Sequence, residues 1–241
     1  MDDPEFIRNI CIKNHLTISD HQLHLLDRYV SLLSEWNKKI NLLSRKDVEN
    51  IRTRHIIGSL AFLFENFLAE KCSIADVGTG GGLPGIPLAI MLPESTVTLI
   101  DSTRKKITTV EDMILALSLG NARILHGRAE ELSQKTDYRN SFDYVIARAV
   151  GSIEDVVKWS SGFLKQRNTS PLISGKQEGK HFICPGSIIL IKGGDLTDEI
   201  SRTVMHQRNW KIETRSMKVE GIPPEDLQDK KFVIIREGKV K

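Results

Sequence analysis

The chain has few cysteines and no long apolar run, and each shortage excludes a class of protein. Its 3 cysteines lie far apart and form no C-x-x-C pair, so we expect no metal site and no redox dithiol. The most apolar segment, 86–92, contains one proline and is closed by another, and nothing approaches the ~18 apolar residues of a membrane helix. The chain begins with acidic residues where a secretory signal is basic. We therefore expect a cytoplasmic protein without a membrane partner.

The chain also lacks a strong excess of charge of either sign. Its 34 Lys and Arg residues stand against 31 Asp and Glu residues, which gives a net charge of +3. That total does not identify a nucleic-acid partner, for which a local stripe of basic side chains matters more. Over 241 residues, 40% hydrophobic and 27% charged residues fit a soluble chain with one large domain or a domain with an appendage. This composition excludes fibrous and fully disordered proteins.

The N-terminal quarter of the chain has helical periodicity. Ser19 and Gln22 fit a capping box, after which apolar residues from Leu23 to Leu33 recur at steps of three and four. A second apolar stripe adjoins the first, so the face is wide and needs a partner surface. We predict an N-terminal helical extension over residues 1–68 that packs on a domain over residues 69–241.

From residue 72 onward, short β-branched runs alternate with helical stretches, as is typical of βαβ units. The predicted fold class is α/β, with a Rossmann-like, mostly parallel sheet whose ligands bind beyond the carboxyl ends of the strands. Ser, Gly and Lys residues dominate 166–185, which predicts a long loop. The predicted strands are 73–77, 96–101, 122–126, 142–147, 187–192, 211–217 and 231–236.

The strongest motif is a glycine-rich turn between the first predicted strand and a helical pattern. Glycines let the backbone approach a ligand closely, and the following helix offers free N–H groups. Gly80-x-Gly82-x-x-Gly85 matches the dinucleotide-binding turn G-x-G-x-x-G. Asp76, Gly78, Gly80 and Gly82 match the D/E-x-G-x-G-x-G loop of S-adenosylmethionine-dependent methyltransferases. A tight turn without any ligand is the third interpretation.

The carboxylate of Asp76 favours the methyl donor. Its negative charge suits the sulfonium or ammonium group of S-adenosylmethionine and would repel a pyrophosphate. Asp101 ends the next strand, where it could accept the ribose hydroxyls of either cofactor, and helix capping is its alternative role. After the third strand, the segment 127–131 offers groups that could bind an adenine.

The residues after the fourth strand narrow the class of methyl acceptor. Amino-group methylation of adenine or cytosine uses an Asn/Asp-Pro-Pro-aromatic loop there, and this sequence has none. Methylation of cytosine carbon 5 needs a thiolate, usually preceded by proline, whereas Cys184 is followed by one. An acceptor atom with a lone pair and no proton to remove would need positioning but no general base. Arg148 could bind the acceptor base or the donor carboxylate, and a salt bridge to Asp143 or Glu154 is its alternative role.

These motifs, with Leu99-Ile-Asp-Ser, Gly127-Arg-Ala-Glu and Trp36-Asn-Lys-Lys-Ile-Asn-Leu, resemble the glucose-inhibited division protein B family over roughly residues 20 to 236. The resemblance implies a class I methyltransferase that uses S-adenosyl-L-methionine to methylate nitrogen 7 of one guanine in 16S ribosomal RNA. It also implies a cofactor loop at Gly78 and Leu83, an adenine site, and Arg148 beside the methyl group as the catalytic candidate. The cofactor-binding residues that we predict are Asp76, Gly78, Thr79, Gly80, Gly82, Leu83, Asp101, Ala129, Glu130 and Arg148.

The sequence departs from the family pattern at Gly58, where Asp is usual, at Leu43, where Thr is usual, and at Ala147, where Ser is common. All three lie toward the expected RNA side of the site. Basic residues in the same regions could neutralise phosphates, although surface lysines and arginines are often only solvated. Trp36 fits the core better than a stacking role, and His55 fits either. The predicted RNA-binding residues are Lys38, Lys39, Asn41, Arg54, His55, Lys105, Lys106 and Lys192.

We therefore expect a monomeric enzyme whose partner is 16S ribosomal RNA or the small ribosomal subunit. Two alternatives stay open on the sequence alone. An NAD-dependent oxidoreductase could use the same glycine turn. A non-catalytic RNA-binding protein could retain a methyltransferase fold.

Overall fold

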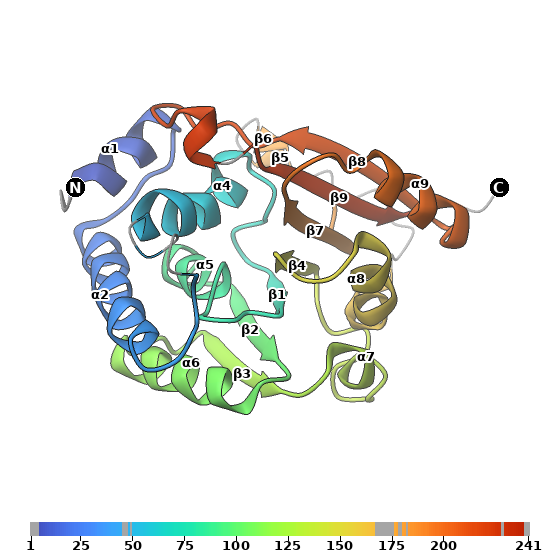
Figure 1. Cartoon of the computed structure of the whole chain (residues 1–241), viewed down its shortest axis with the longest axis horizontal. Helices are drawn as coiled ribbons and strands as arrows, with labels where there is room; N and C mark the ends of the chain where they lie inside the picture. Colours follow the sequence, from blue (N-terminus) through green and yellow to red (C-terminus); the bar gives the residue numbers. More distant parts are fainter. Residues whose placement is uncertain are drawn as a thin grey trace.

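The computed structural model describes residues 5–44, 48, 50–166, 176–177, 180–181, 183–227 and 229–238. Its centre is a seven-stranded sheet with strand order β3-β2-β1-β4-β7-β9-β8 (Figure 1). All neighbouring strands from β3 to β7 are parallel, and β9 runs antiparallel to both of its neighbours. The strands are β1 (Ser73–Val77), β2 (Thr96–Asp101), β3 (Ala122–His126), β4 (Tyr144–Arg148), β7 (Ser187–Lys192), β8 (Trp210–Ser216) and β9 (Lys231–Glu237).

All seven predicted strands are confirmed, with shifts of one or two residues at some ends. β4 begins at Tyr144 because Phe142 forms an isolated bridge with Leu164 instead of pairing with β1. Within the predicted loop 166–185, β5 (Lys176–Gln177) and β6 (Lys180–His181) form a separate antiparallel pair. Positions 167–175, 178–179 and 182 of that loop lie outside the described residues.

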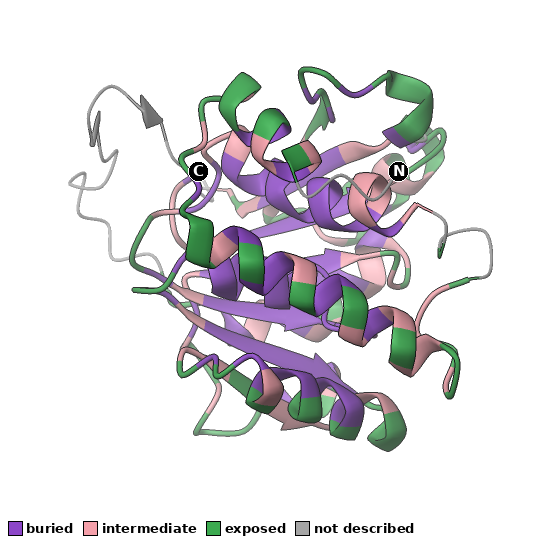
Figure 2. Cartoon of the chain, turned by 90° about the vertical axis from the view of Figure 1, so that its left-hand side faces the viewer, coloured by how far each residue is buried: buried purple, intermediate pink, exposed green. Residues whose placement is uncertain are grey.

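Successive residues of the central strands face opposite helical layers, as the pleat of a strand requires. Ile74 packs into the core with the N-terminal helices, while Ala75 packs into the core with the later helices. Figure 2 shows the same division on the helices, whose buried sides face the sheet and whose exposed sides face outward. The first layer contains η1 (Ile51–Ile57, π-helical), α4 (Gly58–Phe64), α5 (Gly85–Met91) and α6 (Arg104–Ala116), and the second contains α7 (Ala129–Leu132), α8 (Ile153–Ser160) and α9 (Thr197–His206). The short helices η2 (Ser161–Phe163) and η4 (Pro224–Leu227) complete the described part.

The N-terminal helices α1 (Glu5–Lys13) and α2 (Asp20–Asn37) pack outside the first layer (Figure 1). The predicted capping box is present, because Ser19 Oγ accepts from the N–H of Gln22 and the Gln22 side chain accepts from the N–H of Ser19. The apolar face of α2 lies against α5 and α6, so the N-terminal helices pack on the domain as expected. The division at residue 68 stays a prediction. No helix in the described ranges has the length and apolar character needed to cross a membrane.

Candidate cofactor and RNA site

The glycine-rich turn and Arg148 lie at neighbouring strand ends. β1 pairs with β2 on one side and with β4 on the other, and β4 is reached only after the chain has built β2 and β3. The strand order therefore reverses between β1 and β4. In open α/β sheets, ligands bind outside the carboxyl ends of the strands at such a point. The turn after β1 and Arg148 at the end of β4 flank this position.

Asp76 supports the turn from behind. Its side chain is 0% exposed, and its Oδ2 accepts hydrogen bonds from Thr79 Oγ1 at 2.6 Å and from the Gly85 N–H at 2.9 Å. Burial raises the pKa of Asp76 to about 7, against the lowering effect of those two hydrogen bonds. Its Oδ1 is buried and accepts no hydrogen bond from the described residues. In this geometry the Asp76 carboxylate holds the turn together, and its direct contact with the methyl donor stays a prediction.

The turn itself exposes backbone toward the strand ends. Gly78 and Gly80 have φ values of +70° and +58°, in the left-handed region that favours glycine. The N–H groups of Gly78 and Thr79 both donate to the carbonyl of Ile100, at 2.8 and 3.0 Å. A Cβ on Gly80 would meet only one backbone atom, at 3.9 Å. The space beside Gly80 is therefore open, whereas Thr79 is 1% exposed and serves the turn's interior.

Asp101 ties the second strand to the turn. Its Oδ2 accepts from the Gly80 N–H at 3.1 Å, and its Oδ1 accepts from the Thr103 N–H at 2.8 Å. The second bond is a local contact ahead of α6, whose N-cap is Thr103, so the alternative role of Asp101 as the helix cap is wrong. Each carboxylate oxygen has a further lone-pair site. Asp101 can therefore fix the turn and still accept the two hydroxyls of a ribose.

The predicted adenine segment follows β3. The Gly127 N–H donates to the Asp101 carbonyl at 3.1 Å, which joins the ends of β2 and β3. Ala129 begins α7 and is buried, while Glu130 is half-buried and lies 3.5 Å from Arg128 in an exposed ion pair. An acceptor and backbone N–H groups are thus available one strand beyond Asp101. Leu83 and Gly82 are buried within the first turn.

These groups fit S-adenosylmethionine. Its adenosine needs a ribose acceptor beside a closely approachable backbone, and Asp101 and Gly80 are hydrogen-bonded to each other. Its positive charge would favour the ionised form of the buried Asp76 carboxylate, which belongs to the same turn. A pyrophosphate at the turn would be repelled by the carboxylate of Asp101, which lies beside Gly80. When bound, the cofactor would supply an activated methyl group on a sulfonium centre.

Arg148 connects the end of β4 to the N-terminal layer. Its Nη2 donates to the carbonyl of Arg54 at 2.9 Å, and its Nη1 lies 3.5 Å from the carbonyl of His55. The two predicted salt-bridge partners are engaged elsewhere, because Asp143 pairs with Lys165 and Glu154 pairs with a histidine. Arg148 therefore links the candidate active site with η1.

Gly58 brings α4 close to this guanidinium. A Cβ at Gly58 would lie 3.6 Å from Arg148 Nη1. The Asp that is usual in the family would place a carboxylate beside the guanidinium here. In this chain the guanidinium instead donates to main-chain carbonyls of η1.

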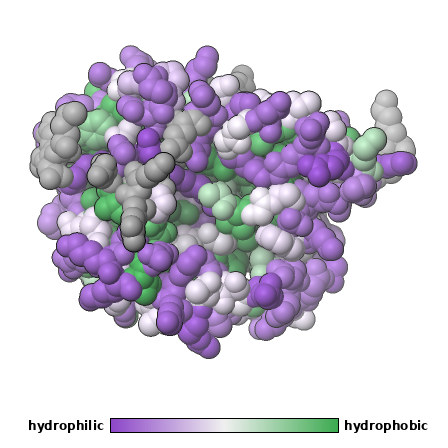
Figure 3. All heavy atoms as spheres, in the orientation of Figure 1, coloured by the Kyte–Doolittle hydropathy of each residue, from purple (hydrophilic) through white to green (hydrophobic). Residues whose placement is uncertain are grey.

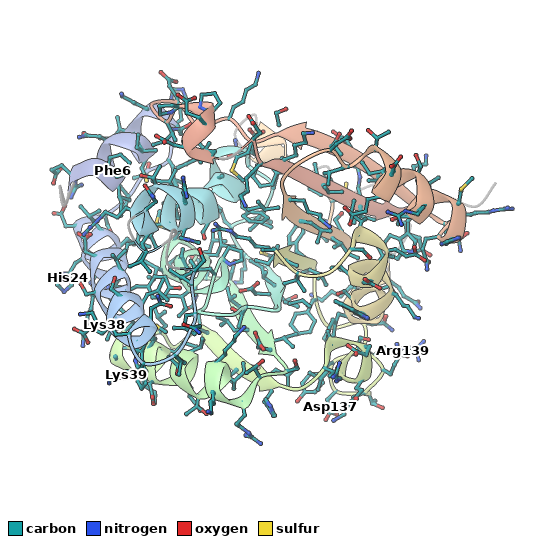
Figure 4. The ribbon with its side chains drawn as sticks, viewed as in Figure 1. Phe6, His24, Lys38, Lys39, Asp137 and Arg139 are labelled. Carbon is teal, nitrogen blue, oxygen red and sulfur yellow. The ribbon has the colours of Figure 1, made fainter. Side chains whose placement is uncertain are left out.

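Four of the predicted RNA-binding residues form an accessible group at the ends of α2 and α6. Lys38, Lys39 and Asn41 are exposed where α2 ends, and Lys39 Nζ lies 4.6 Å from the ring centroid of Trp36 (Figure 4). Lys105 is exposed in the first turn of α6. The helices α2 and α6 contact each other and both lie in the lower left part of Figure 1, so these cations could act on one stretch of phosphates.

The other predicted RNA-binding residues are less accessible. His55 is 7% exposed, so its ring belongs to the core instead of a surface for bases. Arg54 and Lys106 are half-buried. Lys192 ends β7 with its side chain 16% exposed, and it is engaged with Glu199 and with the carbonyl of Gly151. RNA contact by these four residues stays a prediction.

Sequence reasoning missed the residues that surround the turn. Tyr29, read only as part of the apolar stripe of α2, donates a hydrogen bond to the Gly81 carbonyl at 2.8 Å. Val150 covers Gly78, since a Cβ there would lie 2.4 Å from Val150 Cγ2. No periodicity signals either contact, because each joins segments far apart in the sequence.

The strand order, the glycine turn after β1 and the acidic end of β2 define a class I S-adenosylmethionine-dependent methyltransferase. Solved structures share this fold at low identity. A putative rRNA-methylase from Clostridium thermocellum has a TM-score of 0.50 and 12% identity, covering 78% of this chain and 98% of its own. A SAM-dependent methyltransferase from Methanosarcina mazei has a TM-score of 0.50 and 18% identity, covering 74% of this chain and 98% of its own.

The chain belongs to the rRNA small subunit methyltransferase G family (GidB), whose sequence profile matches residues 22–185. A ribosomal RNA small subunit methyltransferase G from Chlorobium limicola is 39% identical over 201 residues, covering 83% of this chain and 80% of its own length. The protein of that name from Alkaliphilus oremlandii is 34% identical over 187 residues, covering 78% of each chain. The predicted enzyme class and cofactor are thereby confirmed, and the oxidoreductase and non-catalytic alternatives are set aside.

Proposed function

We propose that this enzyme transfers a methyl group from S-adenosylmethionine to nitrogen 7 of one guanine in 16S ribosomal RNA. The observation that carries the cofactor part is the hydrogen bond between the Gly80 N–H and Asp101, which joins the open turn to a ribose acceptor. The substrate part rests on the family's printed name and on the exposed cations at the ends of α2 and α6. We propose further that it acts as a monomer in the cytoplasm.

The site chemistry supports an acceptor that needs no general base. Nitrogen 7 of guanine attacks through an in-plane lone pair, so methyl transfer requires alignment of nitrogen, methyl carbon and sulfur in one line. Arg148 ends β4 and could hold the guanine oxygen by charge-assisted hydrogen bonds. No covalent enzyme intermediate is needed.

The cysteines support direct transfer. Burial raises the pKa of the Cys11 thiol to about 12 and that of the Cys72 thiol to about 11. Cys72 precedes β1 and Cys184 precedes β7, so both lie toward the amino ends of parallel strands, away from the glycine turn. A thiolate nucleophile for carbon-5 methylation is therefore not provided from these positions.

The test is methyl transfer from S-adenosylmethionine labelled in its methyl group. Naked 16S RNA and intact small subunits, both from cells lacking this enzyme, serve as acceptors in parallel. We expect stoichiometric labelling of at least one of them, and failure on both would contradict the proposal. RNA binding without labelling would favour a non-catalytic role, and quenching of NADH fluorescence by binding would favour the dinucleotide alternative.

A further inference from the structure

The loop between β4 and α8 forms a wall over the cofactor turn. Val150 lies at the middle of this loop, against the backbone of Gly78, which leaves no room for a side chain there. The flanking residues Ala149 and Gly151 have φ values of +54° and +45°. Left-handed backbone on both sides of Val150 is a conformation that the surroundings must hold in place.

Glu199 and Lys192 hold this loop from the side. Lys192, at the end of β7, donates to the Gly151 carbonyl at 3.0 Å and forms a short ion pair with Glu199. The same oxygen of Glu199, in the first turn of α9, accepts from the Ile153 N–H at 2.6 Å. The ion pair therefore binds the loop on both sides of Ser152, at the carbonyl of Gly151 and at the N–H of Ile153.

The two charges of this pair are largely removed from water. The side chains of Lys192 and Glu199 are 16% and 20% exposed. Each partner compensates the other's desolvation, so loss of one leaves the other unpaired in a poorly solvated place. Arg148 precedes the loop directly and pairs in register with Ile191, so Lys192 stands one residue beyond the strand pair that ends at the catalytic candidate.

We propose that Glu199 is a positioning residue for donor binding, acting through Lys192 and the 149–152 loop on the cofactor turn. This inference rests on the proposed function and deepens it, because it gives Lys192 a role other than phosphate contact. Glu199 orients the ammonium group of Lys192 toward Gly151 and fixes the start of α8. Val150 is then held against Gly78, and the open side of the turn keeps its shape for the donor.

The variants Glu199→Ala and Lys192→Met test this assignment together. Both are expected to weaken S-adenosylmethionine binding, measured by calorimetry, by about tenfold or more, with RNA affinity unchanged within about twofold. In kinetics the KM for the donor rises while the KM for RNA and the kcat at saturating donor change little. Glu199→Gln keeps an acceptor oxygen for Ile153 and Lys192 but not the charge, and is expected to recover part of the affinity for S-adenosylmethionine that Glu199→Ala loses.

Asp198→Ala is the matched control, because it removes an exposed carboxylate from the neighbouring position of the same helix turn. Val150→Ala removes the Cγ methyl groups that lie against Gly78 and leaves the ion pair intact, and it is also expected to weaken S-adenosylmethionine binding. This variant keeps the inference testable if Glu199→Ala does not fold.

Three results would overturn the assignment. If Lys192→Met weakens RNA binding while Glu199→Ala does not, Lys192 contacts phosphate directly. If the variants lower the unfolding midpoint but keep wild-type donor affinity, the ion pair only stabilises the fold. A wild-type protein that binds no donor at all contradicts the proposed function itself, whereas normal wild-type binding with unaffected variants contradicts this inference alone.

Discussion

The hydroxyl of Tyr29 donates a 2.8 Å hydrogen bond to the carbonyl of Gly81, so an N-terminal helix contacts the cofactor turn directly. Tyr29 is 0% exposed, and a Cβ on Gly81 would lie 2.9 Å from Leu33 Cδ1. The turn is thus packed between α2, which contacts Gly81, and Val150, which contacts Gly78. Figure 3 shows less hydrophilic residues in the middle of this side of the molecule, within a largely hydrophilic outline.

Tyr29→Phe is expected to lower the free energy of unfolding by about 1 to 3 kcal/mol, because the buried Gly81 carbonyl loses its donor. The affinity for S-adenosylmethionine should fall in parallel, because the turn loses its hydrogen bond to α2. Urea unfolding and calorimetry measure the two effects. The control Tyr138→Phe lies half-buried in the other helical layer and should change neither quantity. Wild-type donor affinity in Tyr29→Phe would contradict the coupling of α2 to the turn.

Gly78→Ala is expected to abolish measurable donor binding. The alanine would have to adopt the left-handed backbone conformation of Gly78, and its Cβ would lie 2.4 Å from Val150 Cγ2. The accompanying loss of stability is on the order of 1 to 3 kcal/mol. Gly120→Ala is the matched control, since a Cβ there meets nothing within 4 Å. Normal donor binding by Gly78→Ala would show that the turn is not where the donor binds.

Asp76 makes stability depend on pH. Because burial raises the pKa of Asp76 to about 7, the folded state binds this proton more tightly than the unfolded state. The resulting stabilisation is complete below about pH 4 and is lost as the pH rises toward 7. Asp76→Asn keeps an acceptor for Thr79 and Gly85 and removes the titration. Urea unfolding at pH 5 and pH 8 should therefore show the variant gaining stability relative to wild type at the higher pH.

Donor binding should show the opposite dependence in the wild type. The cation of S-adenosylmethionine favours the ionised form of Asp76, so affinity for it should rise as the pH rises toward about 7, by at most about tenfold per pH unit, and level off above that pH. In Asp76→Asn this rise should be absent. An identical pH profile of calorimetric affinity in both proteins would show that the buried carboxylate does not sense the donor.

Lys38→Ala and Lys39→Ala are expected to weaken RNA binding with little effect on donor binding. Each exposed lysine that contacts a phosphate adds about one unit to the slope of log K against log salt, so the double variant should lose about two units. Filter binding across a salt series measures this slope. Lys71→Ala removes an exposed lysine just before β1, at the amino ends of the parallel strands, and should leave the slope unchanged. An unchanged slope in the double variant would exclude this surface.

Local sequence patterns predicted the sheet and the glycine-rich turn after β1. The β-branched runs ending at Val77 and Asp101 predicted β1 and β2 with the bounds that the structure shows, because burial on both faces leaves an uninterrupted apolar signal. The capping box at Ser19 was also predicted correctly, because both of its hydrogen bonds join residues three apart in the sequence. The glycine turn was placed correctly for the same reason.

Roles that depend on tertiary contacts could not be predicted in this way. Asp76 matches a motif position, yet its direction is set by Thr79 and Gly85 behind the turn. Lys192 has the positive charge of a phosphate-binding residue, yet it forms an ion pair with Glu199 on a later helix. Periodicity reports which face of an element is buried and carries no information about the partner that buries it.

The central claim is methylation of nitrogen 7 of one guanine, and nucleoside mapping tests it most directly. Small-subunit RNA from cells lacking this enzyme is treated with the protein and S-adenosylmethionine, digested, and analysed by mass spectrometry. The account predicts one new 7-methylguanosine at a single position, absent when Gly78→Ala replaces the wild type. A methyl group on another base or atom, or no new methyl group on any small-subunit substrate, would contradict it.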